Sequence, residues 1–221
     1  MTQELWSAVD HYLAETLALS DEALEFALTS SDAAGLPSIA VSVPQGKLLN
    51  LIARISGARR ILEIGTLGGY SSIWMARALP SDGKLITIEI DPKHAEVARA
   101  SIAHAGLADR VDVRLGAARD ELPKIAAENA GPFDLVFIDA DKPGIPDYFK
   151  WAMKMSRSGT VIIVDNVVRE GAVIDAMSTD ASVKGVRQLN EILAADARVS
   201  ATVIQTVGTK GYDGFAIALV L

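Results

Sequence analysis

The chain has 221 residues, half of them hydrophobic, and a formal net charge of −7. That length suits one domain with a sizeable core, and the acidic balance argues against general binding to nucleic acid or to an anionic membrane. Cysteine is missing, which excludes disulfides, thiolate metal sites and a thiol nucleophile. We recognise neither a signal peptide nor a membrane span, and we therefore expect a cytoplasmic protein.

The first part of the chain is predicted to be helical. Apolar residues recur at helical spacing over 5–17, and Ser20-Asp21-Glu22 is a typical start signal for a second helix. A loop with glycine and proline separates these from a third predicted helix over 45–55. We expect residues 1–56 to form a helical appendage and lid on a core made by 57–221, all within one domain of 1–221.

From residue 59 onward, strand and helix patterns alternate, which predicts βαβ units and a doubly wound, Rossmann-like α/β fold. Two further strand-like runs, 199–207 and 215–221, are joined by a glycine-rich segment. That chemistry is typical of a hairpin, so the last strand is expected to run antiparallel. The other predicted strands are 60–64, 84–89, 110–115, 133–138 and 160–164, and the predicted helices lie near 69–79, 92–105, 119–129, 146–157 and 182–195.

A glycine-rich loop follows the first strand of this core. The strand carries Glu63, and glycines stand at 65, 68 and 69. Glycine lets a backbone approach a ligand closely, but this spacing does not match the dinucleotide fingerprint. A carboxylate here suits a cationic ligand such as S-adenosylmethionine (SAM), which carries an ammonium and a sulfonium. By itself the motif favours a cofactor site only modestly over an ordinary strand-to-helix turn.

Glu89 ends the second strand, roughly 20 residues past the glycine-rich loop. An acidic residue at this place can accept hydrogen bonds from both ribose hydroxyls of an adenosine cofactor. The signal does not separate methyl transfer from hydride transfer. The nearby Asp91-Pro92 is interpreted as a helix cap.

Two apolar strands end in oxygen ligands. Asp139 follows one strand, and Asp165 and Asn166 end the next. These strands are neighbours in the usual doubly wound order, so the three side chains are expected to lie together at the ligand-binding edge of the sheet. Two carboxylates and an amide suit Mg²⁺ or another divalent cation such as Mn²⁺ or Ca²⁺. The alternative is that both aspartates are helix caps or loop carboxylates.

Lys142 lies three residues after Asp139. A lysine beside a divalent cation in a partly dry crevice is expected to have a lowered pKa and to serve as a general base. The alternative is a surface lysine paired with Asp141, whose own role stays open. The three histidines fall on predicted helices and are expected to lie away from the strand ends.

These motifs resemble the cation-dependent O-methyltransferases, the catechol and caffeoyl-coenzyme A group. The similarity spans about residues 40–221 and is most specific in Asp139-Ala140-Asp141-Lys142 and Asp165-Asn166. The resemblance implies a seven-stranded sheet with an antiparallel last strand, SAM as methyl donor and a homodimer. Two departures concern specificity: Ala118-Arg119 replaces a Ser-Gln pair of the catechol enzymes, and Val167-Val168-Arg169 replaces an aromatic loop of the plant enzymes.

The resemblance also implies residue roles. Lys142 is the implied base, and the implied metal ligands are Asp139, Asp165 and Asn166. Residues implied to bind the cofactor are Val41, Glu63, Gly65, Thr66, Gly69, Tyr70, Ser71, Glu89, Ile90, Gly116, Ala117, Ala118 and Asp139. The irregular segment 31–45, with Val41 near its middle, is expected to line the acceptor pocket.

The sequence therefore predicts a SAM- and metal-dependent O-methyltransferase acting on a small molecule, a vicinal dihydroxy-aromatic of catechol or caffeoyl type. Lys142 would take the proton of one hydroxyl, whose oxygen then attacks the methyl group. The alternatives are an NAD(P)-dependent oxidoreductase and a non-catalytic SAM-binding protein. A nucleic-acid methyltransferase is a weaker choice, given the acidic charge.

Overall fold

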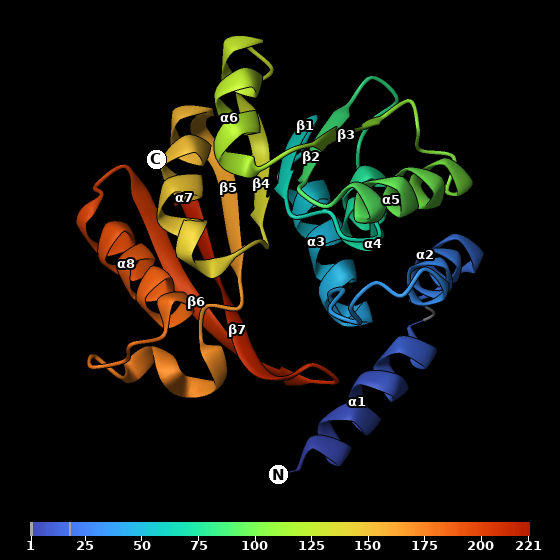
Figure 1. The fold of residues 1–221 in the computed structure, drawn as a ribbon, viewed down its shortest axis with the longest axis horizontal. Helices are drawn as coiled ribbons and strands as arrows, with labels where there is room; N and C mark the ends of the chain where they lie inside the picture. The colour runs from blue at the N-terminus through green and yellow to red at the C-terminus, as the bar shows by residue number, and fades with distance from the viewer. Residues whose placement is uncertain (1, 18) are drawn as a thin grey trace.

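A computed structural model describes residues 2–17 and 19–221, and its centre is one seven-stranded sheet (Figure 1). The strand order is β3-β2-β1-β4-β5-β7-β6, and β7 runs antiparallel to both of its neighbours. This confirms the doubly wound fold and its antiparallel last strand. The strands are β1 (Arg60–Ile64), β2 (Lys84–Glu89), β3 (Val111–Leu115), β4 (Phe133–Ile138), β5 (Ser156–Asp165), β6 (Val199–Gly208) and β7 (Gly211–Val220).

Helices cover both faces of the sheet, which is why its inner strands are apolar on both sides. Side chains such as Leu62 and Val136 pack on one face in a core shared with α6, α7 and α8, whereas Ile61 and Phe137 pack on the other with α3, α4 and α5. The helices are α1 (Gln3–Thr16), α2 (Glu22–Ala33), α3 (Val43–Ile55), α4 (Tyr70–Ala76), α5 (Pro92–His104), α6 (Ala118–Ala127), α7 (Ile145–Lys154) and α8 (Ala181–Ala195).

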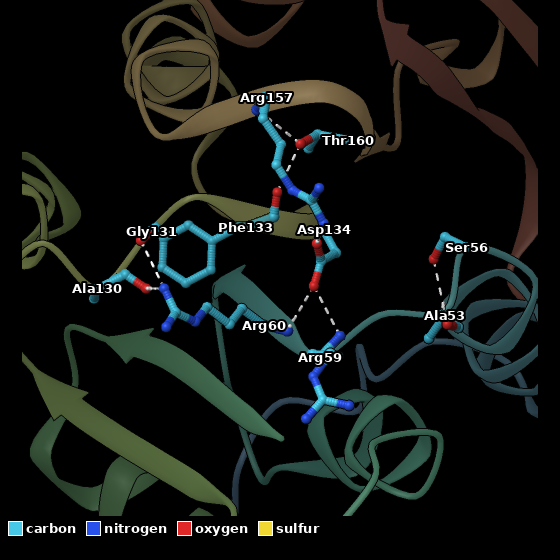
Figure 2. A network of polar contacts seen from close by, with 10 residues as sticks. All are labelled: Ala53, Ser56, Arg59, Arg60, Ala130, Gly131, Phe133, Asp134, Arg157 and Thr160. Carbon is cyan, nitrogen blue, oxygen red and sulfur yellow. Dashed lines mark hydrogen bonds and ion pairs between the residues drawn. The ribbon is translucent and has the colours of Figure 1, made fainter. Parts of the chain in front are cut away.

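At the edge where the parallel strands begin, the buried carboxylate of Asp134 joins three segments (Figure 2). It accepts hydrogen bonds from the backbone N–H groups of Arg59 and Arg60, at 2.8 and 2.9 Å, and from the Arg157 guanidinium at 2.6 Å. Burial opposes ionisation, but the hydrogen bonds from Arg157 and the two amides outweigh it and lower the pKa of Asp134. This carboxylate is a structural clamp between β1, β4 and β5.

Helix α1 lies apart from the layered body, next to the β6–β7 turn (Figure 1). None of the side chains over Gln3–Thr16 is buried. The Asp10 carboxylate accepts a hydrogen bond of 2.8 Å from the Thr209 N–H, and Lys210 of the same turn donates to the Ser38 carbonyl oxygen at 3.0 Å. Across 2–17 and 19–221, no helix has the length and apolar character needed to cross a membrane.

Two predicted boundaries are wrong. Strand β5 begins at Ser156, four residues before the predicted start. The Thr160 hydroxyl accepts a hydrogen bond from the Arg157 N–H and donates one to the Phe133 carbonyl oxygen at the start of β4, which holds this segment in the sheet (Figure 2). The hairpin turn has only two residues, and the glycine-rich segment assigned to a loop is largely strand. Gly214 fits there because a side chain would lie 2.3 Å from the Ile204 carbonyl oxygen on β6.

Candidate active site

A cavity of about 740 Å³ opens at the edge where the parallel strands end. Its wall is built by the segments that follow β1 to β5, with α2 and the loop 39–41 on the far side. This is the crevice in which open α/β sheets bind ligands. The predicted site residues that line it are Val41, Gly65, Thr66, Tyr70, Ser71, Glu89, Ile90, Gly116, Ala117, Ala118, Asp139, Lys142 and Asn166.

The loop after β1 is shaped by close backbone contacts. Gly65 has φ +100°, and a Cβ there would lie 2.0 Å from the Asp139 carbonyl oxygen at the end of β4. Gly69 has φ +85° at the start of α4, where a Cβ would lie 3.3 Å from the backbone of Ala98. Only glycine meets both demands without strain. Gly69 does not line the cavity, so its local role is to let the loop turn beside α5.

Glu89 holds this loop from the end of β2. One carboxylate oxygen accepts hydrogen bonds from the N–H groups of Thr66 and Leu67, at 3.2 and 2.8 Å, and the other accepts from Asp91 at 2.9 Å. Glu89 lines the cavity, and the oxygen that accepts from Asp91 keeps a lone pair for a further donor. It is therefore placed to accept a hydroxyl hydrogen bond, as expected for a ribose.

His94 corrects the expectation that all histidines lie away from the strand ends. It lines the cavity, and its Nδ1 lies 3.6 Å from a carboxylate oxygen of Glu89. Only Ile90 and Asp91 separate β2 from α5, so the first turn of that helix stays at the same edge of the sheet. The shortness of this connection was the available sequence signal.

Glu63 lies behind the cavity wall. Its side chain is fully buried and accepts hydrogen bonds from Ser71 at 2.5 Å and from Ser72. Burial raises the pKa of Glu63 to about 7, against the lowering effect of the two serines. Because Ser71 lines the cavity and Glu63 does not, any influence of this carboxylate on a ligand passes through Ser71 or through its field.

The ends of β4 and β5 place Asp139 and Asp165 in each other's electrostatic field. Burial, and then the negative charge of Asp139, raise the pKa of Asp165 to about 7. Asp165 lies under the cavity wall and accepts hydrogen bonds from Gln45 of α3 at 2.7 Å and from the Asn166 N–H at 2.9 Å. Asn166 itself lines the cavity and has φ +57°, in the left-handed region.

These side chains fit a hard divalent cation. Two carboxylates and one amide oxygen are the donors that Mg²⁺ prefers, and a cation would relieve the repulsion that raises the pKa of Asp165. Within 2–17 and 19–221 no group of three or more His, Cys, Asp or Glu side chains could hold a metal. The Asn166 oxygen and atoms from outside the chain would therefore complete the coordination.

Lys142 lies beside this pair of carboxylates. Its side chain is 10% exposed, and Nζ donates a hydrogen bond of 2.9 Å to Asp139 Oδ1. Lys142 also lines the cavity, so its amine can reach both the aspartate and a bound molecule. Among the described residues the cavity wall thus combines the Lys142 amine and the partly buried Asp139 carboxylate at one end with a hydrogen-bonded glycine-rich loop at the other.

Sequence reasoning missed several residues in and around the cavity wall. Gln45 contacts Asp165 from 120 positions away, and no local pattern announces that contact. Asp141 does not point to the metal ligands but accepts hydrogen bonds within its own turn and from Tyr148. Further lining residues that were not predicted are Leu28, Ser31, Ile39, Ala40, Ile64, Leu67, Gly68, Ile88, Arg119, Ala140, Asp141 and Tyr148.

Known proteins resemble this chain over its full length. A family model described as O-methyltransferase matches residues 15–218. A catechol O-methyltransferase from Niastella koreensis is 52% identical over 220 residues, covering 100% of both chains. The solved O-methyltransferase from Bacillus cereus in complex with SAH has a TM-score of 0.98 and 55% identity, covering 100% of both chains. TomG, an O-methyltransferase from Streptomyces achromogenes solved with SAM, has a TM-score of 0.96 and 56% identity, covering 100% of this chain and 99% of TomG.

Proposed function

This chain belongs to the O-methyltransferase family and is a SAM-dependent enzyme, and we propose that it methylates one hydroxyl of a vicinal dihydroxy-aromatic molecule with the help of a divalent cation. The observation that carries the proposal is the hydrogen bond between Lys142 and Asp139 beside the buried Asp165. These three side chains would bring a proton acceptor, Lys142, next to a cation site at the wall of one cavity. The oxidoreductase and the non-catalytic alternatives are set aside.

Each half of the cavity has its own task in this proposal. On the donor side, Glu89 binds the ribose, the turn Gly116-Ala117-Ala118 borders the adenine, and Ser71, backed by Glu63, binds the methionine part. On the acceptor side, Asp139, Asp165 and Asn166 would hold the cation. SAM would supply the methyl group as a sulfonium, and the cation would lower the pKa of the acceptor hydroxyl.

The chemistry of the chain's own residues is proton transfer and orientation. Lys142 Nζ accepts the proton of the acceptor hydroxyl, a task for which it must lose a proton of its own first. The oxygen would then attack the methyl carbon in line, so that the O–C bond forms as the C–S bond of the sulfonium breaks; the sulfur leaves as a neutral thioether, and no covalent bond to the protein forms. Holding donor and acceptor in near-attack geometry contributes on the order of 7–11 kcal/mol in well-oriented cases.

A panel assay tests this function. Catechol, a caffeoyl ester and a phenol with a single hydroxyl are each incubated with SAM, with Mg²⁺ or with excess chelator, and the methylated product is quantified. We expect transfer to the first two only, and only with the metal, because one hydroxyl cannot provide two oxygens to the cation. Full activity in excess chelator would contradict the metal role, and equal rates on the single phenol would contradict the acceptor class.

Asp139→Ala is the matching variant, with the exposed Asp147→Ala on α7 as its control. Asp139→Ala should lose the response to Mg²⁺ and nearly all turnover, while Asp147→Ala keeps both. Calorimetry with Mg²⁺ alone gives a readout that does not depend on turnover. A cytoplasmic homodimer that acts on small molecules rather than on nucleic acid or membranes stays our prediction for the setting of this activity.

A further inference from the structure

Lys142 stands in a short 3₁₀ turn, Lys142–Gly144, that directly follows Asp141. Asp141 caps this turn: its Oδ2 accepts a hydrogen bond of 3.0 Å from the Gly144 N–H. Pro143 fixes one backbone dihedral in the middle of the turn. The position of the Lys142 backbone is therefore set by groups on both sides of it.

The other oxygen of Asp141 is held by α7. Tyr148 Oη donates a hydrogen bond of 2.5 Å to Asp141 Oδ1, and the tyrosine ring packs on Gly144, where a Cβ would lie 2.4 Å from the ring. Burial, and then the hydrogen bond to Asp141, raise the pKa of Tyr148, so its hydroxyl stays a donor. Both oxygens of Asp141 are thus engaged in fixing the turn.

Helix α8 closes the turn from the side away from the cavity. A Cβ on Gly185 would lie 2.2 Å from the Lys142 carbonyl oxygen and 3.0 Å from Pro143 Cα, so the helix backbone touches the turn backbone directly. No residue of α8 lines the cavity. Glycine in the middle of a helix weakens it relative to alanine, and this contact accounts for its presence at position 185.

From these contacts we propose that Tyr148 and Gly185 are positioning residues for Lys142, with Asp141 as the anchor between them. The inference rests on the proposed role of Lys142 as the base. Lysine has a flexible stem with much rotamer freedom, and a misplacement of about 1 Å can cost about 100-fold in rate. Tyr148, Asp141 and Gly185 fix where that stem begins, while the hydrogen bond to Asp139 fixes where it ends.

Tyr148→Phe tests the hydroxyl while keeping the ring on Gly144. We expect kcat to fall about tenfold, with KM for the acceptor and the calorimetric Kd for SAM unchanged and little change in melting temperature. Tyr12→Phe, in exposed α1, is the matched control and should change nothing. A weaker Kd for SAM with unchanged kcat would instead make Tyr148 a cofactor contact and overturn the proposal.

A double-mutant cycle separates the positioning effect from a general loss. In the Lys142→Ala background, Tyr148→Phe should cause no further decrease, because the residue that it positions is gone. Multiplying losses would overturn the positioning role alone. Full activity of the single variant Lys142→Ala would overturn the base assignment, and with it this inference.

Gly185→Ala tests the contact from α8. The added methyl must push the turn away, and we expect kcat to fall about 100-fold with the Kd for SAM unchanged. Helix propensity alone predicts the reverse, a slightly more stable protein of normal activity. Normal kcat would show that α8 does not fix Lys142. If this variant fails to fold, Tyr148→Phe and the cycle still decide the question.

Discussion

The two ends of the sheet handle buried carboxylates in opposite ways. Where β4 begins, Asp134 receives two backbone N–H groups and the Arg157 guanidinium, and its pKa is lowered (Figure 2). Where β5 ends, Asp165 is buried in the field of Asp139, and its pKa is raised to about 7. An aspartate at a strand end is thus structural where hydrogen-bond donors compensate its charge and lower its pKa. It is a candidate ligand where burial and a neighbouring carboxylate raise its pKa.

Among these variants Asp165→Asn should have the largest effect on turnover. If its turnover stays normal, the contrast between Asp134 and Asp165 is wrong. Turnover is expected to fall about 1000-fold, on the order of 4 kcal/mol, because a cation ligand is lost. The metal-free protein should nevertheless melt a few degrees higher, since a buried charge disfavoured by Asp139 is removed. Thermal melts in chelator check the stability, and lower stability would show that Asp165 is structural after all.

Asp134→Ala is the opposite case. It leaves the backbone N–H groups of Arg59 and Arg60 without their acceptor, and we expect a loss of about 1–3 kcal/mol in the free energy of unfolding. Turnover of the folded protein should stay close to normal, because the site lies at the other end of the sheet. Urea titration and kcat measure the two quantities, and a large loss of kcat without loss of stability would contradict the division.

Glu63 predicts a pH dependence. Its pKa in the folded chain, about 7, lies above the ordinary value of 4.5, so the folded state holds this proton more tightly than the unfolded state. The contribution to stability therefore falls as pH rises from about 4.5 to about 7. Cationic SAM prefers the ionised form, so affinity should rise about tenfold between about pH 6 and about pH 8.

Calorimetry of SAM binding at saturating metal measures this rise, and proton release on binding below pH 7 accompanies it. Glu63→Gln should bind SAM with an affinity that no longer depends on pH in this window. Glu96→Gln, at an exposed position of α5, is the control and should keep the dependence. An unchanged slope in Glu63→Gln would assign the titration to another group.

Asp213 is a second structural carboxylate, and replacing it should have the smallest effect on kcat among these variants. It lies near the metal-side edge, yet its Oδ1 accepts hydrogen bonds of 2.9 Å from the N–H groups of Val168 and Arg169. These hold a loop in which Asn166, Arg169 and Glu170 have positive φ. Asp213→Ala should speed amide hydrogen exchange over 167–171 and lower kcat only about threefold. A decrease in kcat as large as that of Asp165→Asn would show that accepting hydrogen bonds from backbone N–H groups does not identify a structural carboxylate.

The features that could be predicted from the sequence are those that a local residue pattern determines. Apolar runs fixed the strands, and the end of each run located Glu89, Asp139 and Asp165, because the carboxyl ends of parallel strands share one edge. Strand order followed from the doubly wound rule, and the observed β1-β4-β5 neighbours confirm it.

Contacts between distant segments could not be predicted in this way. Gln45 meets Asp165 because α3 packs across the sheet, and Gly185 meets Lys142 because α8 closes over a turn. The burial of Glu63 behind Ser71 depends on the rotation of α4 against β1. Such features come from packing in three dimensions, which periodicity along the chain does not encode.

Gly65 has a consequence for engineering. Its backbone touches the Asp139 backbone, and this contact joins the loop after β1 to the end of β4, the two segments that in our proposal face the methyl donor and the acceptor. A chimaera that takes these two segments from different parents must keep both the glycine and the spacing, so donor and acceptor halves do not behave as exchangeable modules. Libraries aimed at new acceptors are better placed at 39–41, which line the cavity from outside both segments.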